Sequence, residues 1–427
     1  MKRLQMLWLG ILFLISNIPF PIYAEENDIQ TNIYPYVEEN APTVTSSTVF
    51  LYDADQNQIL LNRHGDEQMF PASLTKMMTE ILAIENLKDL NQTVTITPKM
   101  WEGLLEANAS VAGFEEGSVV TVRDLLYGCA LPSGADAVQA LVMTVSGDMA
   151  AFVELMNQKA QEIGMQHTHF SNPTGLHAED HYSTAHDMAI LLQYCLQNET
   201  FKELIGTSSY VTTNGLVLES TVWSKINGEI PGLIGGKTGY TLQAGRCLAS
   251  AADFNGMHLI LVTGGSEGDG HIRDAETLYR WYSDHYERKT VMESHMQLAD
   301  IPILDTWPGK NMTVFNPEAV MMDLPKNADI QIKPHVADHL YAPIAKGAQL
   351  GSLTITANEQ VIYTTSLYAD DTIHRNMFAY VWRRLKEHSL LSMLATGCIA
   401  VLLGLLRRKR MRMRHRRHRP RRRKERY

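Results

Sequence analysis

The chain has 427 residues, of which 45% are hydrophobic and 20% are charged, and its formal net charge is −9. This length supplies enough apolar material for two folded domains, and no internal repeat or low-complexity segment precedes the final basic residues. The four cysteines have no zinc-type spacing, which argues against a structural metal site.

The net charge hides two regions of opposite sign. Residues 407–427 contain fourteen Lys and Arg and one Glu. Residues 25–406 contain 22 Lys and Arg against 46 Asp and Glu, a formal charge of −24. Because the main part of the chain is so acidic, we predict that it does not bind nucleic acid.

Residues 1–24 are predicted to be a secretory signal peptide. Two basic residues at positions 2 and 3 are followed by the apolar stretch 7–22, and Ala24 precedes an acidic pair. An uncleaved membrane anchor is the alternative interpretation. Residues 25–44 are polar and irregular, as expected of a leader to the fold.

Residues 45–287 are predicted to form an α+β domain. Segment 45–61 is rich in β-branched residues and has a polar turn in its middle, which predicts a hairpin. A helix is predicted over 73–84, and its N-terminal N–H groups would favour negative charge developing near Ser73. Helical spacing of apolar residues continues over 125–144, 150–163 and 184–197.

Strand patterns dominate after residue 206. Five consecutive runs with short turns predict one antiparallel sheet, over 210–213, 217–222, 235–240, 246–253 and 257–264. A helix over 273–285 is expected to pack on that sheet and to close the domain. Further short strands, at 313–324, 330–334 and 350–367, predict a small β-rich domain over 290–370, and residues 371–388 would form a juxtamembrane segment.

Residues 389–406 are predicted to be a transmembrane helix. They hold no charged residue over 18 positions, about 27 Å of helix, which is short for a membrane span. A buried core helix is the alternative. Aromatic residues on one side (Phe378, Tyr380 and Trp382) and the basic stretch 407–427 on the other favour a span with a cytoplasmic tail near anionic lipid. The folded domains would then lie outside the cell.

The most informative motif is Ser73-Leu74-Thr75-Lys76. On a helix, residues three apart lie on one face about 5–6 Å apart between Cβ atoms, so the lysine amine can reach the serine hydroxyl. A serine becomes a nucleophile when a base is adjacent, and a lysine can be that base if burial lowers its pKa. Alone this motif is weak, because most matches are solvated helix surface.

Two further motifs follow at long spacing. Ser133-Gly134-Ala135 lies 60 residues after Ser73, and Lys237-Thr238-Gly239 lies 104 residues after Ser133. The order S-x-x-K, S-x-N, K-T-G is typical of penicillin-binding proteins and class A β-lactamases. Each motif has an ordinary structural reading, but three in this order indicate a serine acyl-transfer site.

Over 41–286 the chain resembles the low-molecular-mass penicillin-binding proteins that are D-alanyl-D-alanine carboxypeptidases, the serine peptidases of family S11. The stretches FSNPTGL at 170–176, HYSTAHDMA at 181–189, and GYT and AGRCL within 239–248 carry this resemblance more than they suggest a β-lactamase. Residues 290–367 resemble the β-rich domain that follows the catalytic domain in this family. The resemblance implies a penicillin-binding-protein/β-lactamase-like transpeptidase domain, in which helices pack on an antiparallel sheet, then a small all-β domain.

The resemblance also implies the chemistry. Ser73 would attack the penultimate D-alanine of a peptidoglycan stem peptide, Lys76 would take its proton, and Ser133 would relay a proton to the departing D-alanine. β-Lactams would acylate the same serine. No cofactor or metal is implied, and His177, His181 and His186 are assigned to a family loop rather than to a metal site.

The resemblance assigns substrate binding to the third motif. Lys237 and Thr238 would bind the free carboxylate of the stem peptide, and Gly239 and Tyr240 continue the strand beside the nucleophile. The N–H groups of Ser73 and Tyr240 would form the oxyanion hole. Two roles are possible for Arg246: it could bind the substrate carboxylate, or it could form a structural ion pair.

One position departs from the family pattern, which usually has Asn where this chain has Ala135. The missing amide would normally contact both the catalytic lysine and the substrate, and Asp136 is a doubtful substitute because it points about 100° away on a helix. We expect reduced activity. The alternatives are a catalytically weak or inactive wall-binding scaffold, or a β-lactamase, for which no convincing E-x-x-L-N element is present.

Overall fold

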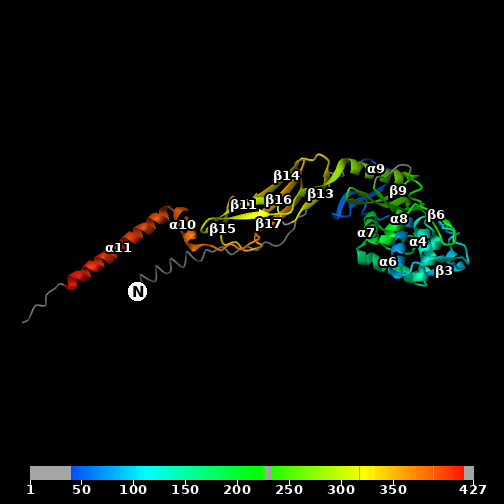
Figure 1. Ribbon diagram of the computed structural model, residues 1–427, viewed down its shortest axis with the longest axis horizontal. Helices are drawn as coiled ribbons and strands as arrows, with labels where there is room; N and C mark the ends of the chain where they lie inside the picture. Colours follow the sequence, from blue (N-terminus) through cyan, green and yellow to red (C-terminus); the bar gives the residue numbers. More distant parts are fainter. Residues whose placement is uncertain (1–39, 227–229, 231, 317, 388, 418–427) are drawn as a thin grey trace, which may run out of the picture.

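The computed structural model describes residues 40–226, 230, 232–316, 318–387 and 389–417. The predicted signal peptide, most of the predicted leader and the last ten residues of the basic tail lie outside this part. Figure 1 shows an elongated molecule, with a mixed domain from β1 to α9 at one end and a slender β-rich domain next to it. Helices α10 (Met377–Glu387) and α11 (Ser389–Arg417) lie at the other end.

The mixed domain is built on a five-stranded antiparallel sheet with the order β2-β1-β9-β8-β7. The two N-terminal strands form the predicted hairpin and pair with the last strand of the domain. The bounds are β1 Thr48–Asp53, β2 Gln58–Arg63, β7 Leu233–Thr241, β8 Gly245–Phe254 and β9 Met257–Ser266.

Alternation along the central strands gives the sheet two apolar faces. In β1, Phe50 packs in the cluster formed with the main group of helices, whereas Val49 and Leu51 pack in the cluster that contains α9 (Gly270–His285). Successive strand residues point to opposite faces, so this arrangement follows from the period of two. The helix predicted over 273–285 therefore closes the domain by packing on the sheet, as expected.

The predicted sheet was wrong in its first two strands. β5 (Ser209–Val211) and β6 (Val217–Glu219) pair only with each other, and β1 and β2 take their places in the main sheet. Short turns between neighbouring strands indicate antiparallel pairing, but they do not say which pairs join a larger sheet. The missing partners come from about 200 residues earlier in the chain.

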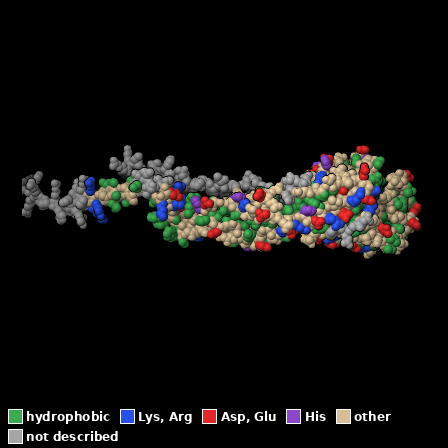
Figure 2. Space-filling model, turned by 90° about the horizontal axis from the view of Figure 1, so that it is seen from above, with side chains coloured by type: hydrophobic (Ala, Val, Ile, Leu, Met, Phe, Trp, Pro, Cys, Tyr) green, Lys and Arg blue, Asp and Glu red, His purple; other side chains and the backbone are tan. Residues whose placement is uncertain are grey.

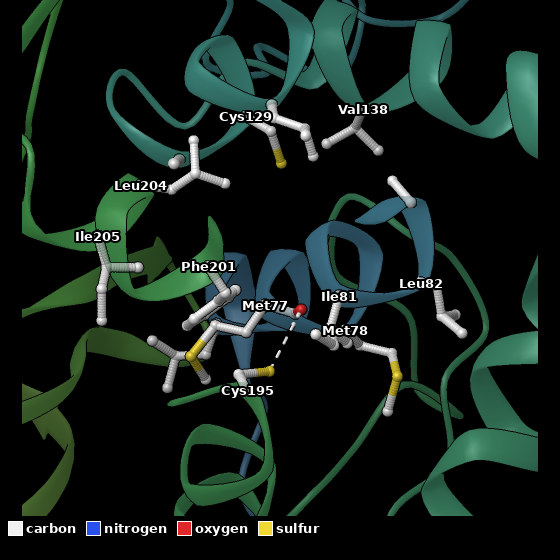
Figure 3. Close-up of a cluster of buried hydrophobic side chains, with 14 of the residues drawn as sticks. Met77, Met78, Ile81, Leu82, Cys129, Val138, Cys195, Phe201, Leu204 and Ile205 are labelled. Carbon is white, nitrogen blue, oxygen red and sulfur yellow. Dashed lines mark hydrogen bonds between the residues drawn. The ribbon is translucent and has the colours of Figure 1, made fainter. Parts of the chain in front are cut away.

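The predicted helices lie close to the observed ones, with a correction in the segment 125–144 and one further helix, α8 (Glu199–Gly206), that was not predicted. The run predicted over 125–144 is two helices, α4 (Val122–Ala130) and α5 (Ala135–Val145), because Pro132 interrupts it and Ser133 has a φ of +64°. The other bounds are α3 Lys76–Asn86, α6 Met149–Ile163 and α7 Ala185–Leu196. Figure 3 shows the apolar side chains that α3 buries against its neighbours.

The β-rich domain has its own core and three small sheets. Their orders are β10-β13, β12-β11-β15 and β14-β16-β17. Apolar residues from all three meet in one cluster that includes Met292, Leu324 and Ile355. The strands are β10 Tyr286–Met292, β11 Gln297–Leu304, β12 Lys310–Phe315, β13 Val320–Pro325, β14 Ile330–Val336, β15 Leu340–Tyr341, β16 Gln349–Ala357 and β17 Gln360–Tyr368.

A buried cluster of charges joins the two domains. Arg288 of β10 contacts Asp53 of β1 at 2.9 Å and Asp323 of β13 at 2.8 Å, and it also contacts Asp55. Tyr282 of α9 donates a hydrogen bond to Asp323. Burial, reinforced by Asp323, raises the pKa of Asp53 to about 7.

Within the described residues, no single helix has both the length and the apolar character needed to cross a membrane. One bent pair, α5 and α6 at 89° to each other, passes that test by length and composition alone.

Candidate active site

The first motif forms a tight turn at the start of α3. Ser73 lies in a 3-10 turn, Ala72–Thr75, and the regular helix begins at Lys76 rather than at Ser73 as predicted. Ala72 has a φ of +47°, an uncommon conformation for a residue with a side chain. The Nζ atom of Lys76 lies 2.9 Å from the Oγ atom of Ser73. The predicted serine–lysine contact is therefore formed.

Lys76 is held from its other side by a loop far along the chain. Its Nζ atom donates a hydrogen bond of 2.6 Å to the carbonyl oxygen of Thr174. The Asn172 side chain fixes this loop, because its Oδ1 atom accepts hydrogen bonds from the N–H groups of Gly175 and Leu176 and from Thr174. Sequence reasoning assigned no role to Thr174, since a carbonyl contact carries no side-chain signature.

The environment of Lys76 favours a neutral amine. The residue is only 3% exposed. Burial, together with repulsion from Lys237, lowers its pKa to about 7. A lysine with this pKa can accept a proton near neutral pH, whereas an ordinary lysine cannot.

The second and third motifs form another serine–lysine pair. The Nζ atom of Lys237 lies 2.9 Å from the Oγ atom of Ser133, across 104 residues of sequence, and it also contacts the carbonyl oxygen of Thr238 at 3.0 Å. Ser133 lies in the left-handed bend between α4 and α5, which turns its hydroxyl toward β7. Lys237 is fully buried, and burial lowers its pKa.

Strand β7 passes directly beside the first serine. A Cβ atom on Gly239 would lie 3.1 Å from the backbone nitrogen of Ser73, so this glycine permits the close approach. On the other side of the turn, a Cβ atom on Gly175 would lie 1.9 Å from the carbonyl oxygen of Ala72. The two glycines let the nucleophile turn fit between β7 and the 172–176 loop.

Ser73, Lys76, Ser133, Thr238 and Gly239 line one cleft with a volume of about 560 Å³, and the fully buried Lys237 reaches Ser133 from outside that lining. Tyr240 lies on the wall of this cleft, and the Arg246 guanidinium stacks 4.4 Å from the Tyr240 ring centre. Thr238 and Thr221 share a hydrogen bond of 2.7 Å there. The described lining residues include basic side chains and no Asp or Glu. Such a cleft suits a ligand with a free carboxylate.

Arg246 forms no ion pair with any residue in the described part of the chain. Its side chain contacts Tyr240 on the cleft wall instead. Of the two roles left open by the sequence, the structural ion pair therefore has no support here.

Ala135 lines the cleft at the start of α5 and brings no polar side chain. Asp136 does not replace the missing amide. Its carboxylate accepts hydrogen bonds from the backbone N–H groups of Ala112, Gly113 and Phe114, and so it holds the loop before α4. The carboxylate of Asp136, next to Ala135, therefore has a structural role.

The three histidines at 177, 181 and 186 have separate environments. His181 is buried between Thr75 and Ser171, and burial lowers its pKa to about 4. His186 contacts Asp66 at 2.8 Å. The described residues include no group of three His, Cys, Asp or Glu that could hold a metal ion.

Comparisons with known proteins agree with this geometry. Residues 36–268 match the sequence profile of the D-alanyl-D-alanine carboxypeptidase family, and residues 308–375 match that of the C-terminal domain of penicillin-binding protein 5. D-alanyl-D-alanine carboxypeptidase DacF of Bacillus subtilis is 29% identical over 350 residues, which cover 79% of this chain and 88% of the relative. DacA of Haemophilus influenzae is 29% identical over 389 residues, covering 85% and 92%.

Solved structures show the same likeness. Penicillin-binding protein 5 from Haemophilus influenzae superposes with a TM-score of 0.62 at 26% identity, covering 79% of this chain and 99% of that one. The Streptomyces K15 DD-transpeptidase superposes with a TM-score of 0.52 at 29% identity, covering 57% and 98%.

Proposed function

The chain belongs to the D-alanyl-D-alanine carboxypeptidases, the penicillin-binding serine peptidases that act on peptidoglycan, and from this premise we propose a role for each residue of its cleft. Ser73 is the nucleophile, Lys76 its base, and Ser133 the group that passes a proton to the leaving amine. Lys237 and Thr238 bind the terminal carboxylate. The single observation that carries this assignment is the pair of serine–lysine contacts, each 2.9 Å long, whose two serines line one cleft.

Acylation begins at Ser73. Neutral Lys76 accepts the hydroxyl proton while Ser73 Oγ attacks the carbonyl carbon of the penultimate D-alanine. An ester forms between the enzyme and the shortened peptide, and the peptide bond to the terminal D-alanine breaks. The proton reaches the departing amine through Ser133. Water then hydrolyses the ester and frees the enzyme.

The oxyanion is held by two backbone N–H groups, those of Ser73 and Tyr240. The support is the approach of β7, whose Gly239 leaves no room for a side chain beside the Ser73 nitrogen. Each donor of this kind contributes about 10²–10³ in rate. β-Lactams acylate Ser73 through the same contacts, because their strained amide takes the place of the D-alanyl peptide bond.

Ala135 tunes this reaction and does not abolish it. Both serine–lysine contacts form without an amide at position 135, so the groups that make and break bonds are in place. The scaffold reading therefore has no observation in its favour, and neither has the β-lactamase reading.

The test is release of D-alanine from a peptide ending in D-Ala-D-Ala by the purified full chain. We expect release by the wild-type protein and none by Ser73→Ala. Ser110→Ala is the matched control, because Ser110 lines the same cleft outside the three motifs. Wild-type protein that binds the peptide but releases no D-alanine would overturn the proposal in favour of a scaffold.

We also propose that residues 389–406 cross the membrane once, with the catalytic domain (45–287) and the β-rich domain (290–370) outside the cell and residues 407–427 inside. The support is their lack of charge and the basic stretch that follows. Figure 2 shows hydrophobic side chains in α11 followed by Lys and Arg side chains. Several of these apolar residues are more than half exposed, including Ile399, Val401 and Leu405.

Membrane fractionation tests this topology. The full chain is expected to stay in the membrane pellet after alkaline extraction, and a chain ending at residue 387 is expected in the soluble fraction. External protease should remove the catalytic domain and leave the basic tail protected. Release of the full chain by alkaline extraction would contradict the span.

A further inference from the structure

One buried acidic residue behind the cleft has no part in the mechanism above. Glu80 lies on α3 four residues after Lys76, on the same face of the helix. Its side chain is 0% exposed, and neither carboxylate oxygen has a hydrogen-bond partner among the described residues, although the Cys129 thiol lies beside it. Such a carboxylate is costly to bury unless opposite charges offset it.

The charged and titratable groups around Glu80 come from its own helix and from three other elements. Lys237 of β7 exerts the strongest electrostatic attraction on it, and Lys76 adds to this attraction. Cys129 approaches from α4, and Cys195 of α7 is within its electrostatic reach. Figure 3 shows Cys129 on one side of α3 and Cys195 on the other. Both thiols stay neutral, because burial raises their pKa well above the usual value.

Resting on the roles proposed above, we propose that Glu80 is the counter-charge of the two active-site lysines and a positioning residue that governs how many protons Lys76 and Lys237 hold together. Glu80 does not line the cleft and forms no hydrogen bond with Ser73. Two buried ammonium groups in one cleft repel each other, and a carboxylate behind them offsets that repulsion.

The proton count explains why this arrangement suits the reaction. In one state Lys76 is an ammonium and Glu80 a carboxylate; in the other Lys76 is a neutral amine and Glu80 a neutral acid. With Lys237 charged, both states carry one net positive charge and the same number of protons. Lys76 can therefore become the base without a proton leaving the buried site. Burial raises the pKa of Glu80 to about 7, so both states are accessible near neutral pH.

The experiment measures the rate of acylation of the full chain by a chromogenic β-lactam between pH 4 and 10. In Glu80→Gln the side chain keeps its size but loses its charge and its proton. Lys76 and Lys237 lose an attractive partner, so the pKa of each should fall. The alkaline limb, where Glu80 is ionised, should move to lower pH by about one unit, and the acid limb, where Glu80 takes up its own proton, should move by less.

Glu85→Gln is the matched control, because it removes one negative charge from the same helix at a site that faces Lys159 of α6. Its pH profile should stay in place. Glu80→Met, which fills the site with an apolar side chain, should reproduce the shift. An unmoved alkaline limb in a folded Glu80→Gln protein would overturn the proposal, even if the thermal midpoint of unfolding changes. Failure of both Glu80 variants to fold would also overturn it, because packing would then be the role.

The same data separate this proposal from the proposed function. If Lys76→Met still acylates at the wild-type rate, Lys76 is not the base and the proposed mechanism fails. If Lys76→Met is inactive and Glu80→Gln leaves the alkaline limb of the wild-type profile unmoved, only the role of Glu80 fails.

Discussion

Ser73 with Lys76 and Ser133 with Lys237 have the same 2.9 Å separation of hydroxyl and amine, but they are built differently. The first pair lies within one turn at the start of α3. The second joins the bend before α5 to the central part of β7. Burial lowers the pKa of both lysines, and repulsion from Lys237 lowers that of Lys76 further, to about 7. Identical contacts can thus support different chemistry, a base in one pair and a cation in the other.

Replacing the base should have the largest effect. In Lys76→Met nothing accepts the Ser73 proton, so the rate of acylation by fluorescent penicillin should fall about 10³-fold. Lys225→Met is the control, since Lys225 lines the cleft but pairs with Asp269. A Lys76→Met protein that labels as fast as the control would show that the two pairs do not differ in the proposed way.

Replacing the cation should have a smaller and more selective effect. Lys237→Met should lower kcat/KM about 10²-fold for a peptide with a free C-terminal carboxylate, because a charge-assisted contact is lost. A peptide with an amidated C-terminus, already poor with the wild type, should lose much less. Equal losses for both peptides would assign Lys237 to the chemistry instead of to carboxylate binding.

Restoring an amide at position 135 should raise the activity of the Ser73–Lys76 pair. Ala135→Asn places a hydrogen-bonding group beside Lys76 and the substrate, and we expect D-alanine release to rise about ten- to a hundredfold. Ala135→Val tests side-chain size without the amide. If Val raises the rate of D-alanine release as much as Asn does, or if Asn does not raise it, the missing amide at Ala135 is not the cause of reduced activity.

The pH dependence follows from the lowered pKa of Lys76, about 7. The neutral amine is the active form, so acylation should be near its plateau above pH 7 and fall about tenfold for each pH unit below it. The pKa of Lys237 is also below its usual value, so carboxylate binding should weaken on the alkaline side earlier than for an ordinary lysine. A flat acylation rate from pH 5 to 8 would rule out a lysine base of this pKa.

The two pairs also differ in how far the sequence predicts them. Lys76 lies three positions after Ser73, and helical geometry alone brings them together. Ser133 and Lys237 are 104 residues apart, and only the family resemblance placed them in one site. Their meeting depends on the left-handed bend at Ser133 and on the position of β7 in the sheet, which local patterns do not determine.

The fold also divides into features that local sequence patterns predict and features that they do not. The hairpin at the start of the domain and the helix that closes it were predicted from their patterns. The edge of the main sheet was not, because β1 pairs with β9, about 200 residues away. Glu80 was also missed. A glutamate on a helix reads as solvated surface, and the available signal was its place on the face of Lys76, among Met77, Ile81 and other apolar residues.

Mass spectrometry of the penicillin adduct tests the central claim most directly. After incubation of the full chain with benzylpenicillin, we expect a mass gain of one intact antibiotic and a peptide map that places it on Ser73. An adduct on Ser133 would reverse the roles of the two pairs. The absence of any adduct in a folded wild-type protein would contradict the acyl-enzyme mechanism.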